Sequence, residues 1–247
     1  MGDMRISGTT SMRAAAVTGA ALILLTACGG AGGDGDKSGG QGKQALRSSA
    51  PVSDPTRIPN VGDALQAKIP ADSRQVVAVY GNGVNSADST VVLYTKQGKK
   101  WERTRSWAAH NGKRGWTTGH REGDKRSPVG VYSLSDAGGV LPDPGARLPY
   151  NQAAAFAAPH YWPKTHWHDF DYVIAIDYNR VKGTSPLDPT RPQGQSKGGS
   201  IWLHMDHGSG TSACVSVPKS GMEYLLKNLD PALHPVVVMG DKAHLAA

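Results

Sequence analysis

Short runs of apolar and β-branched residues recur along the chain from about residue 61 onward, and Gly, Pro and Asn separate them. Runs of roughly four to eight such residues between turn residues are typical of β-strands. The pattern predicts strands at 75–80, 90–95, 101–107, 130–134, 172–177, 200–204, 214–217 and 235–239. Segments 136–170 and 180–199 are rich in Pro and Gly and lack a clear period, which predicts long loops.

One segment near the end of the chain has a helical period instead. Its apolar residues recur at intervals of three and four positions, at Met222, Leu225, Leu226 and Leu229. This spacing predicts a helix with one face against the core. Ser220 is placed to cap the helix at its start, and Pro231 is placed to end it. With no internal repeat, these patterns together predict one mainly β domain.

The N-terminal segment has the pattern of a targeting signal. Arg5 and Arg13 precede an apolar run at 14–25, which is too short to span a bilayer comfortably. The run ends in LTAC at residues 25–28, which resembles the lipobox of bacterial lipoproteins. Cleavage before Cys28 would leave a lipid-modified cysteine at the new N-terminus. The alternative is an ordinary secretory signal with an incidental cysteine.

These patterns divide the chain into three segments. We expect a lipoprotein signal peptide at 1–27, a lipid-anchored, Gly/Ser-rich flexible linker at 28–58, and the folded domain at 59–247. A flexible coil of the linker's length reaches roughly 25–30 Å. The expected location is extracytoplasmic, on the cell membrane and facing the cell wall.

The formal net charge of the chain is +7. A moderately basic surface suits an anionic environment such as a cell wall or a membrane face, and solubility is an equally good explanation. No block of consecutive Lys or Arg residues indicates a nucleic-acid-binding arm. We therefore expect no nucleic-acid partner.

Cys214 is the first candidate for chemistry. If Cys28 carries a lipid it cannot form a disulfide, so Cys214 is the one remaining thiol of an exported protein. The residues before it, Gly-Thr-Ser-Ala at 210–213, are small and leave peptide N–H groups uncovered, where they can stabilise an oxyanion. A thiol with an ordinary pKa of about 8.5 needs a nearby base or positive charge to act as a nucleophile.

His204 is the preferred partner of that thiol. It ends the predicted strand 200–204, and a hairpin to the next strand would place its imidazole beside Cys214 on two antiparallel strands. His207 is the rival base, but it lies in the turn next to Gly208, where we expect it to be more exposed. A buried structural cysteine remains an equal alternative, because free Cys is among the most buried residue types.

Two motifs, the first of them made of two segments, together resemble a known family. Residues 201–204 read IWLH and residues 211–218 read TSACVSVP, while residues 123–132 upstream read GDKRSPVGVY. In this order they are similar to the signature of the L,D-transpeptidase (YkuD-type) catalytic domain, in a form that resembles an actinobacterial-type subgroup. The resemblance covers about residues 70–242. In the family the upstream segment is scaffold beside the active site, so we assign it no catalytic role.

Three positions depart from the family pattern. Ser212 stands where the family has His, Ala213 stands where it has Gly, and Ser216 stands where Arg or Asn is common. The loop between His204 and the cysteine is also shorter than in the better-known members.

The resemblance implies a mixed β-sandwich with one helix after the catalytic strand and long loops. It implies Cys214 as nucleophile, His204 as base, the Met205 carbonyl as the group that orients the imidazole, and the N–H groups of Ala213 and Cys214 as oxyanion donors. The substrate would be a peptidoglycan stem peptide, with no cofactor, and we expect a monomer. Two alternatives remain open: an L,D-carboxypeptidase or hydrolase with the same Cys–His pair, and a non-catalytic wall-binding lipoprotein.

Five residues are weaker candidates for substrate contact: Ser212, Ser216, Tyr178, Asn179 and Trp202. For Asn179, formation of a turn is an equal alternative.

The loop before residue 172 is rich in histidine and tryptophan. His160, His166, His168 and Asp169 lie there and suggest metal, together with His204 and His207. Because the chain lacks a His-Glu-x-x-His spacing, we expect no metal. We expect instead that the loop, with Tyr161, Trp162 and Trp167, forms one wall of a substrate groove, with simple packing on the sheet as the alternative.

Overall fold

The computed structural model describes residues 54–247. The predicted signal peptide, Cys28 and the predicted linker as far as residue 53 lie outside the described residues. The folded unit extends to Ala247. None of the helices within residues 54–247 has the length and apolar character that crossing a membrane requires.

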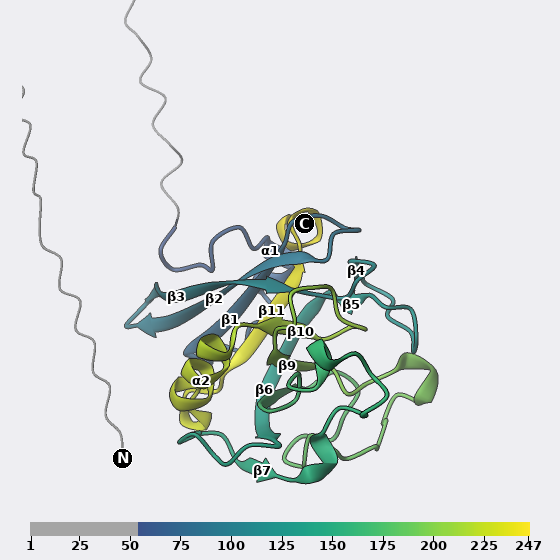
Figure 1. Cartoon of the computed structure of the whole chain (residues 1–247). Helices are drawn as coiled ribbons and strands as arrows, with labels where there is room; N and C mark the ends of the chain where they lie inside the picture. Colours follow the sequence, from purple (N-terminus) through teal and green to yellow (C-terminus); the bar gives the residue numbers. More distant parts are fainter. Residues whose placement is uncertain (1–53) are drawn as a thin grey trace, which may run out of the picture. The chain divides into compact units, whose positions relative to one another are not determined.

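Nine strands form one mixed sheet (Figure 1). They are β1 (Gln75–Gly81), β2 (Asp88–Gln97), β3 (Lys100–His110), β6 (Gly130–Gly139), β7 (Tyr150–Gln152), β8 (Val173–Ile176), β9 (Trp202–Met205), β10 (Val215–Val217) and β11 (Val236–Asp241). Their order is β11-β1-β2-β3-β10-β9-β8-β6-β7, and β11 also pairs with β6. The sheet therefore closes on itself, with β7 as an appendage at β6.

All eight predicted strands are present, so the mainly β fold class is confirmed. The sequence pattern missed β7 and a small sheet of β4 (Trp116–Thr117) and β5 (Ser127–Pro128). These strands are only two or three residues long, too short to show a period of two. The segment 136–170 is also not wholly a loop, since β6 continues to Gly139 and β7 lies within it.

Both faces of the strands around β1 are buried. Val77 and Val79 belong to the main core inside the closed sheet, whereas Val76 and Ala78 belong to a second cluster on the outer face. Successive side chains of a strand point to opposite faces, so a strand that is buried on both sides is apolar throughout. The outer cluster also contains Leu245.

Within residues 54–247, three α-helices accompany the sheet: α1 (Asp63–Gln66), α2 (Lys219–Asn228) and α3 (Lys242–Ala246). Short 3-10 turns lie at Ala154–Phe156, Lys164–His166, Gln195–Lys197 and Pro231–Leu233. Figure 1 shows α1 next to the C-terminal end of the chain, where the Gly62 N–H donates to the Leu245 carbonyl at 2.7 Å.

Helix α2 follows β10, the strand that begins after Cys214, as predicted. Met222, Leu225 and Leu226 of this helix, and Leu229 just after its end, are fully buried in the main core. The predicted cap is wrong, because Pro218 occupies the N-cap position and no side chain caps the helix. Proline suits a helix start, where its missing N–H would have no partner inside the helix.

The last residues of the segment placed in the linker already contact the domain. Pro55 accepts a hydrogen bond from the Trp101 N–H at 2.7 Å, and Ile58 is 1% exposed within the outer cluster.

The connection from β9 to β10 is not a hairpin, which corrects the antiparallel arrangement expected from the sequence. The two strands are parallel, with Leu203 opposite Val215 and His204 opposite Ser216. The intervening loop at 206–214 leads the chain back to the starting end of β9, and β10 enters the sheet between β9 and β3. Short parallel connections of this kind are unusual, and the loop has anchors that hold it in place.

Candidate active site

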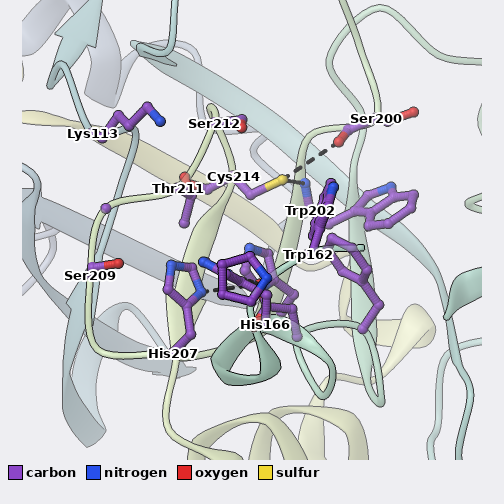
Figure 2. A pocket seen from close by; sticks show the side chains of 15 residues that line it. Lys113, Trp162, His166, Ser200, Trp202, His207, Ser209, Thr211, Ser212 and Cys214 are labelled. Atoms are coloured by element: carbon purple, nitrogen blue, oxygen red, sulfur yellow. Dashed lines mark hydrogen bonds and ion pairs between the residues drawn. The ribbon is translucent and has the colours of Figure 1, made fainter. Parts of the chain in front are cut away.

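A cavity of about 710 Å³ opens between β9 and two loops. One loop precedes β8 and contributes Trp162, Asp169 and Phe170, and the other is the 206–214 connection. Cys214 and His204 both line the cavity. The structure therefore brings the predicted nucleophile and base to one place, beside the loop predicted to form a wall (Figure 2).

The Cys214 thiol is held by the backbone of the segment that enters β9. Sγ accepts a hydrogen bond from the Trp202 N–H at 3.4 Å and donates one to the Ser200 carbonyl at 3.6 Å (Figure 2). Burial raises the pKa of the thiol to about 11, although the Trp202 N–H partly opposes the shift. The thiol at rest is therefore protonated near neutral pH.

His204 is 2% exposed in the middle of the sheet. Its Nδ1 donates a hydrogen bond to the Met205 carbonyl at 2.8 Å, the contact predicted for that carbonyl. This bond leaves Nε2 as the nitrogen free to accept a proton. Burial lowers the pKa of His204, while the Met205 carbonyl and the Asp169 carboxylate oppose the shift. The imidazole is thus neutral near pH 7 and competent as a base.

The parallel register sets the relation between the two side chains. Cys214 lies one residue before the Val215–Leu203 pair, which places it beside Trp202 and not beside His204. Positions two residues apart on a strand are separated by about 6.5 Å. Within residues 54–247, the hydrogen bonds of Sγ go to backbone groups and none joins it to His204.

Thr211 anchors the loop that carries Cys214. Its N–H donates to the Asn111 carbonyl at 2.9 Å, and its carbonyl accepts from the Lys113 N–H at 2.8 Å. Its hydroxyl donates to the Cys214 carbonyl at 2.6 Å. These bonds tie the residues before the cysteine to the end of β3.

Ser127 is a second anchor and comes from the upstream motif. Its hydroxyl donates to the Ala213 carbonyl at 2.6 Å and accepts a hydrogen bond from the Gly112 N–H at 2.8 Å. The motif therefore lies beside the active site as scaffold, as the resemblance implied. The hydroxyl itself could not be singled out from the sequence, because a serine before a proline also suits an ordinary turn.

The family model for the L,D-transpeptidase catalytic domain, YkuD, matches residues 83–238, well over half of the chain. The chain belongs to this family. No curated protein sequence matches it.

Two solved structures are similar to this YkuD chain. One is Bd1075 of Bdellovibrio bacteriovorus, at 15% identity and a TM-score of 0.38, covering 75% of this chain and 52% of that one. The other is the helical cell shape determining protein Pgp2 of Campylobacter jejuni, at 16% identity and a TM-score of 0.38, covering 69% and 48%. The chain thus spans about half the length of these proteins.

Two of the predicted contact residues and one predicted oxyanion donor lie around the cavity of the YkuD domain. Ser212 and Trp202 line it, and Ala213 adjoins Cys214 with its carbonyl fixed by Ser127. Ser212 is exposed, so a substrate that enters the cavity meets its side chain.

Ser216, Tyr178 and Asn179 are not brought to the cavity. Ser216 is fully buried, and its hydroxyl donates to the Asp206 carboxylate at 2.6 Å. The Tyr178 hydroxyl donates to the Lys197 carbonyl at 3.0 Å. Ser216, on β10, thus holds the loop that follows β9, and Tyr178 holds the loop that leads to β9.

Asn179 has the role of a turn residue, the alternative given for it above. Its φ is +45°, a left-handed conformation that Asn tolerates better than most residues. Its side-chain amide donates to the carbonyls of Gly194 and Gly198 and accepts from the Gln193 N–H, which closes the long loop before β9.

His207 is more buried than the sequence predicted. Its side chain is only 4% exposed, because the ring packs between His166 and His204 in the wall of the cavity. Nδ1 of His207 lies 3.1 Å from Asp169 Oδ2. The sequence interpretation placed this histidine in an exposed turn, and missed that the loop before β8 covers it.

Proposed function

We propose that this protein is a cysteine-dependent acyltransferase that acts on peptidoglycan stem peptides. One observation carries the proposal: Cys214 and His204 line the same cavity, and the imidazole is held in the tautomer that leaves Nε2 free to accept a proton. The family to which the chain belongs supports the cell-wall substrate.

The reaction begins when a stem peptide enters the cavity. His204 Nε2 takes the proton of the Cys214 thiol, and the thiolate attacks the carbonyl carbon of the bond to the terminal D-amino acid. The imidazolium then returns the proton to the departing amine, the C–N bond breaks, and a thioester remains on Cys214. The amine of a second stem attacks this thioester, the C–S bond breaks, and the proton lost by the amine passes through His204 to the departing thiolate, which restores the Cys214 thiol.

The backbone before Cys214 is suited to stabilise the charge that develops on the carbonyl oxygen. In this proposal the N–H groups of Ala213 and Cys214 donate to the oxyanion. The anchors at Ser127 and Thr211 fix the carbonyls of the same two residues, at 2.6 Å each, and so fix the direction of this backbone. Donors held rigidly in advance stabilise a transition state without reorganising.

Activation requires that the thiol leave its backbone partners. Sγ contacts Trp202 and Ser200 at rest, and His204 lies at the next outward-facing position of β9. Catalytic hydrogen bonds are often long or absent before substrate binds. In this proposal, rotation of the cysteine side chain toward His204 accompanies entry of the substrate.

We further propose that the mature protein is anchored by a lipid on Cys28, outside the cytoplasm, where the linker lets the domain reach the wall. This proposal rests on the lipobox-like sequence at 25–28 and on the Gly/Ser-rich composition that follows it.

The direct test is product analysis on purified muropeptides that carry tetrapeptide stems. Under the proposal, the parent protein releases the terminal D-amino acid and forms cross-linked dimers, while Cys214→Ala and His204→Ala abolish both products. His168→Ala is the matched control for a histidine substitution, because that side chain is 74% exposed and does not line the cavity. Trimmed stems without dimers would identify a carboxypeptidase instead.

A second candidate is a wall-binding protein without catalysis. The absence of a hydrogen bond between Sγ and His204 within residues 54–247 favours it, as does the high pKa of the thiol, about 11. In this case the parent and Cys214→Ala would bind peptidoglycan equally and neither would change the stems.

A further inference from the structure

Three side chains on the cavity wall converge in the manner of metal ligands. His166 and Asp169 come from the loop before β8, and His207 comes from the loop after β9. One potential ligand atom from each residue lies within 4.8 Å of the other two. The ring centroids of His166 and His207 are 4.1 Å apart, and Figure 2 shows the two rings close together.

The distances suit a tetrahedral ion. Asp169 Oδ2 lies 3.0 Å from His166 Nδ1 and 3.1 Å from His207 Nδ1. In a tetrahedral zinc site with bonds of about 2.0–2.1 Å, neighbouring ligand atoms are about 3.3 Å apart. A small closure or opening of the loops is enough to place all three at bonding distance.

His207 supplies an independent sign of a missing ligand. Its side chain is 4% exposed, yet neither ring nitrogen has a hydrogen-bond partner within residues 54–247. The short approach of Nδ1 to Asp169 therefore lacks the direction of a hydrogen bond. Buried polar groups without partners are uncommon and destabilising, and a cation between Asp169 and the two imidazoles would give this nitrogen a partner.

The donor set identifies the chemistry of the ion. Two imidazoles and one carboxylate favour zinc or another first-row divalent metal over magnesium or calcium, which prefer oxygen ligands. All three residues line the cavity, and His166 is 29% exposed there, so an ion can enter and keep a position open for a small oxygen ligand. We propose that His166, Asp169 and His207 form a binding site for a Zn²⁺-type divalent cation.

Such an ion would join the two loops that form the cavity walls. Asp169 already connects them through its backbone, since its carbonyl accepts a hydrogen bond from the Met205 N–H at 2.9 Å. The site uses neither Cys214 nor His204, so the proposal of a metal site does not depend on the proposal of acyl transfer.

The test is a metal titration of the tag-free full chain after removal of metals with EDTA. Isothermal titration with ZnCl₂ is expected to show one tight equivalent, and Co²⁺ is expected to give the visible absorption of a tetrahedral complex. Asp169→Asn and His166→Ala should each weaken Zn²⁺ binding at least tenfold. Far-UV circular dichroism in EDTA checks that both variants fold. If Asp169→Asn does not fold, the Zn²⁺ affinity of His166→Ala decides the test.

His168→Ala is the matched control. His168 pairs with Asp171 three residues later at 2.9 Å, just as His166 pairs with Asp169, but it is 74% exposed and has no second histidine beside it. It should bind Zn²⁺ like the parent. Cys214→Ala should do the same, which excludes the thiol as a ligand. A stoichiometry well below one, or affinity unchanged in both Asp169→Asn and His166→Ala, would overturn the proposal.

Discussion

At the scale of single residues, the state of the Cys214 thiol follows from its surroundings. Burial keeps it neutral by raising its pKa to about 11, and its S–H donates to the Ser200 carbonyl, although the Trp202 N–H favours the thiolate. His204 is neutral for the same physical reason, because burial disfavours the charged imidazole. Both groups therefore rest uncharged, and in the proposed mechanism the ion pair forms when a substrate displaces the thiol.

The high pKa of the resting Cys214 thiol should make its alkylation rate depend on pH. Only the thiolate reacts with iodoacetamide, so a folded-state pKa of about 11 predicts an alkylation rate at Cys214 that rises about tenfold per pH unit between pH 7 and 10. Stopped-time alkylation followed by peptide mass mapping measures this rate. A plateau below pH 9 would show a thiolate already stabilised at rest.

Removing the Ser127 hydroxyl tests the anchor of the catalytic loop. Ser127→Ala leaves the Gly112 N–H and the Ala213 carbonyl without their buried partner. The expected loss is about 1–3 kcal/mol in the free energy of unfolding, measured in urea. Ser212→Ala is the control, since that side chain is exposed and should change stability by less than about 0.5 kcal/mol. Equal stability of the two variants would refute this role for the hydroxyl.

The sequence located Cys214, His204 and the Met205 carbonyl, because short motifs carry them. It named His166, Asp169 and His207 among possible metal ligands but gave no reason to bring these three together, because Asp169 and His207 lie 38 positions apart in two loops without helical spacing. Nor could it show that Ser216 turns away from the cavity toward Asp206. Loop conformation decides such contacts, and periodicity does not describe loops.

At the scale of elements, strands were predictable and their pairing was not. The eight predicted strands could be recognised from their apolar and β-branched residues, as in β1, because each is buried on at least one face. The parallel pairing of β9 with β10 depends on β10 entering beside β3, a contact between segments more than a hundred residues apart. No local pattern near Cys214 distinguishes that arrangement from a hairpin.

The packing of α2 behind the catalytic strand gives a prediction for this scale. Leu225 is fully buried in the main core, so Leu225→Ala should lower the free energy of unfolding by about 2–5 kcal/mol. Lys227→Ala, on the exposed side of the same helix, is the comparison and should change it by less than about 0.5 kcal/mol. Urea denaturation followed by tryptophan fluorescence measures both. Similar midpoints for the two variants would contradict the assigned orientation of α2.

At the scale of the whole molecule, the YkuD domain contains a cavity lined by Cys214 and His204, and we propose that a lipid on Cys28 anchors the chain. The cavity lies between loops, while the closed sheet and α2 supply the rigid support beneath it. The basic charge of +7 suits work beside an anionic wall.

The anchor is tested in cells that process lipoproteins. Metabolic labelling with a radioactive or clickable fatty acid should mark the parent protein, and Cys28→Ala should abolish the label and release the protein from the membrane fraction. Cys214→Ala is the control and should keep the label. Label that persists in Cys28→Ala would contradict lipidation at this site.

Intact-protein mass spectrometry tests the central claim most directly. After incubation with a carbapenem, which resembles the acyl donor of L,D-transpeptidases, the account predicts one covalent adduct, mapped by peptide mass to Cys214 and absent from Cys214→Ala. An unmodified protein whose Cys214 still reacts with iodoacetamide would contradict the account.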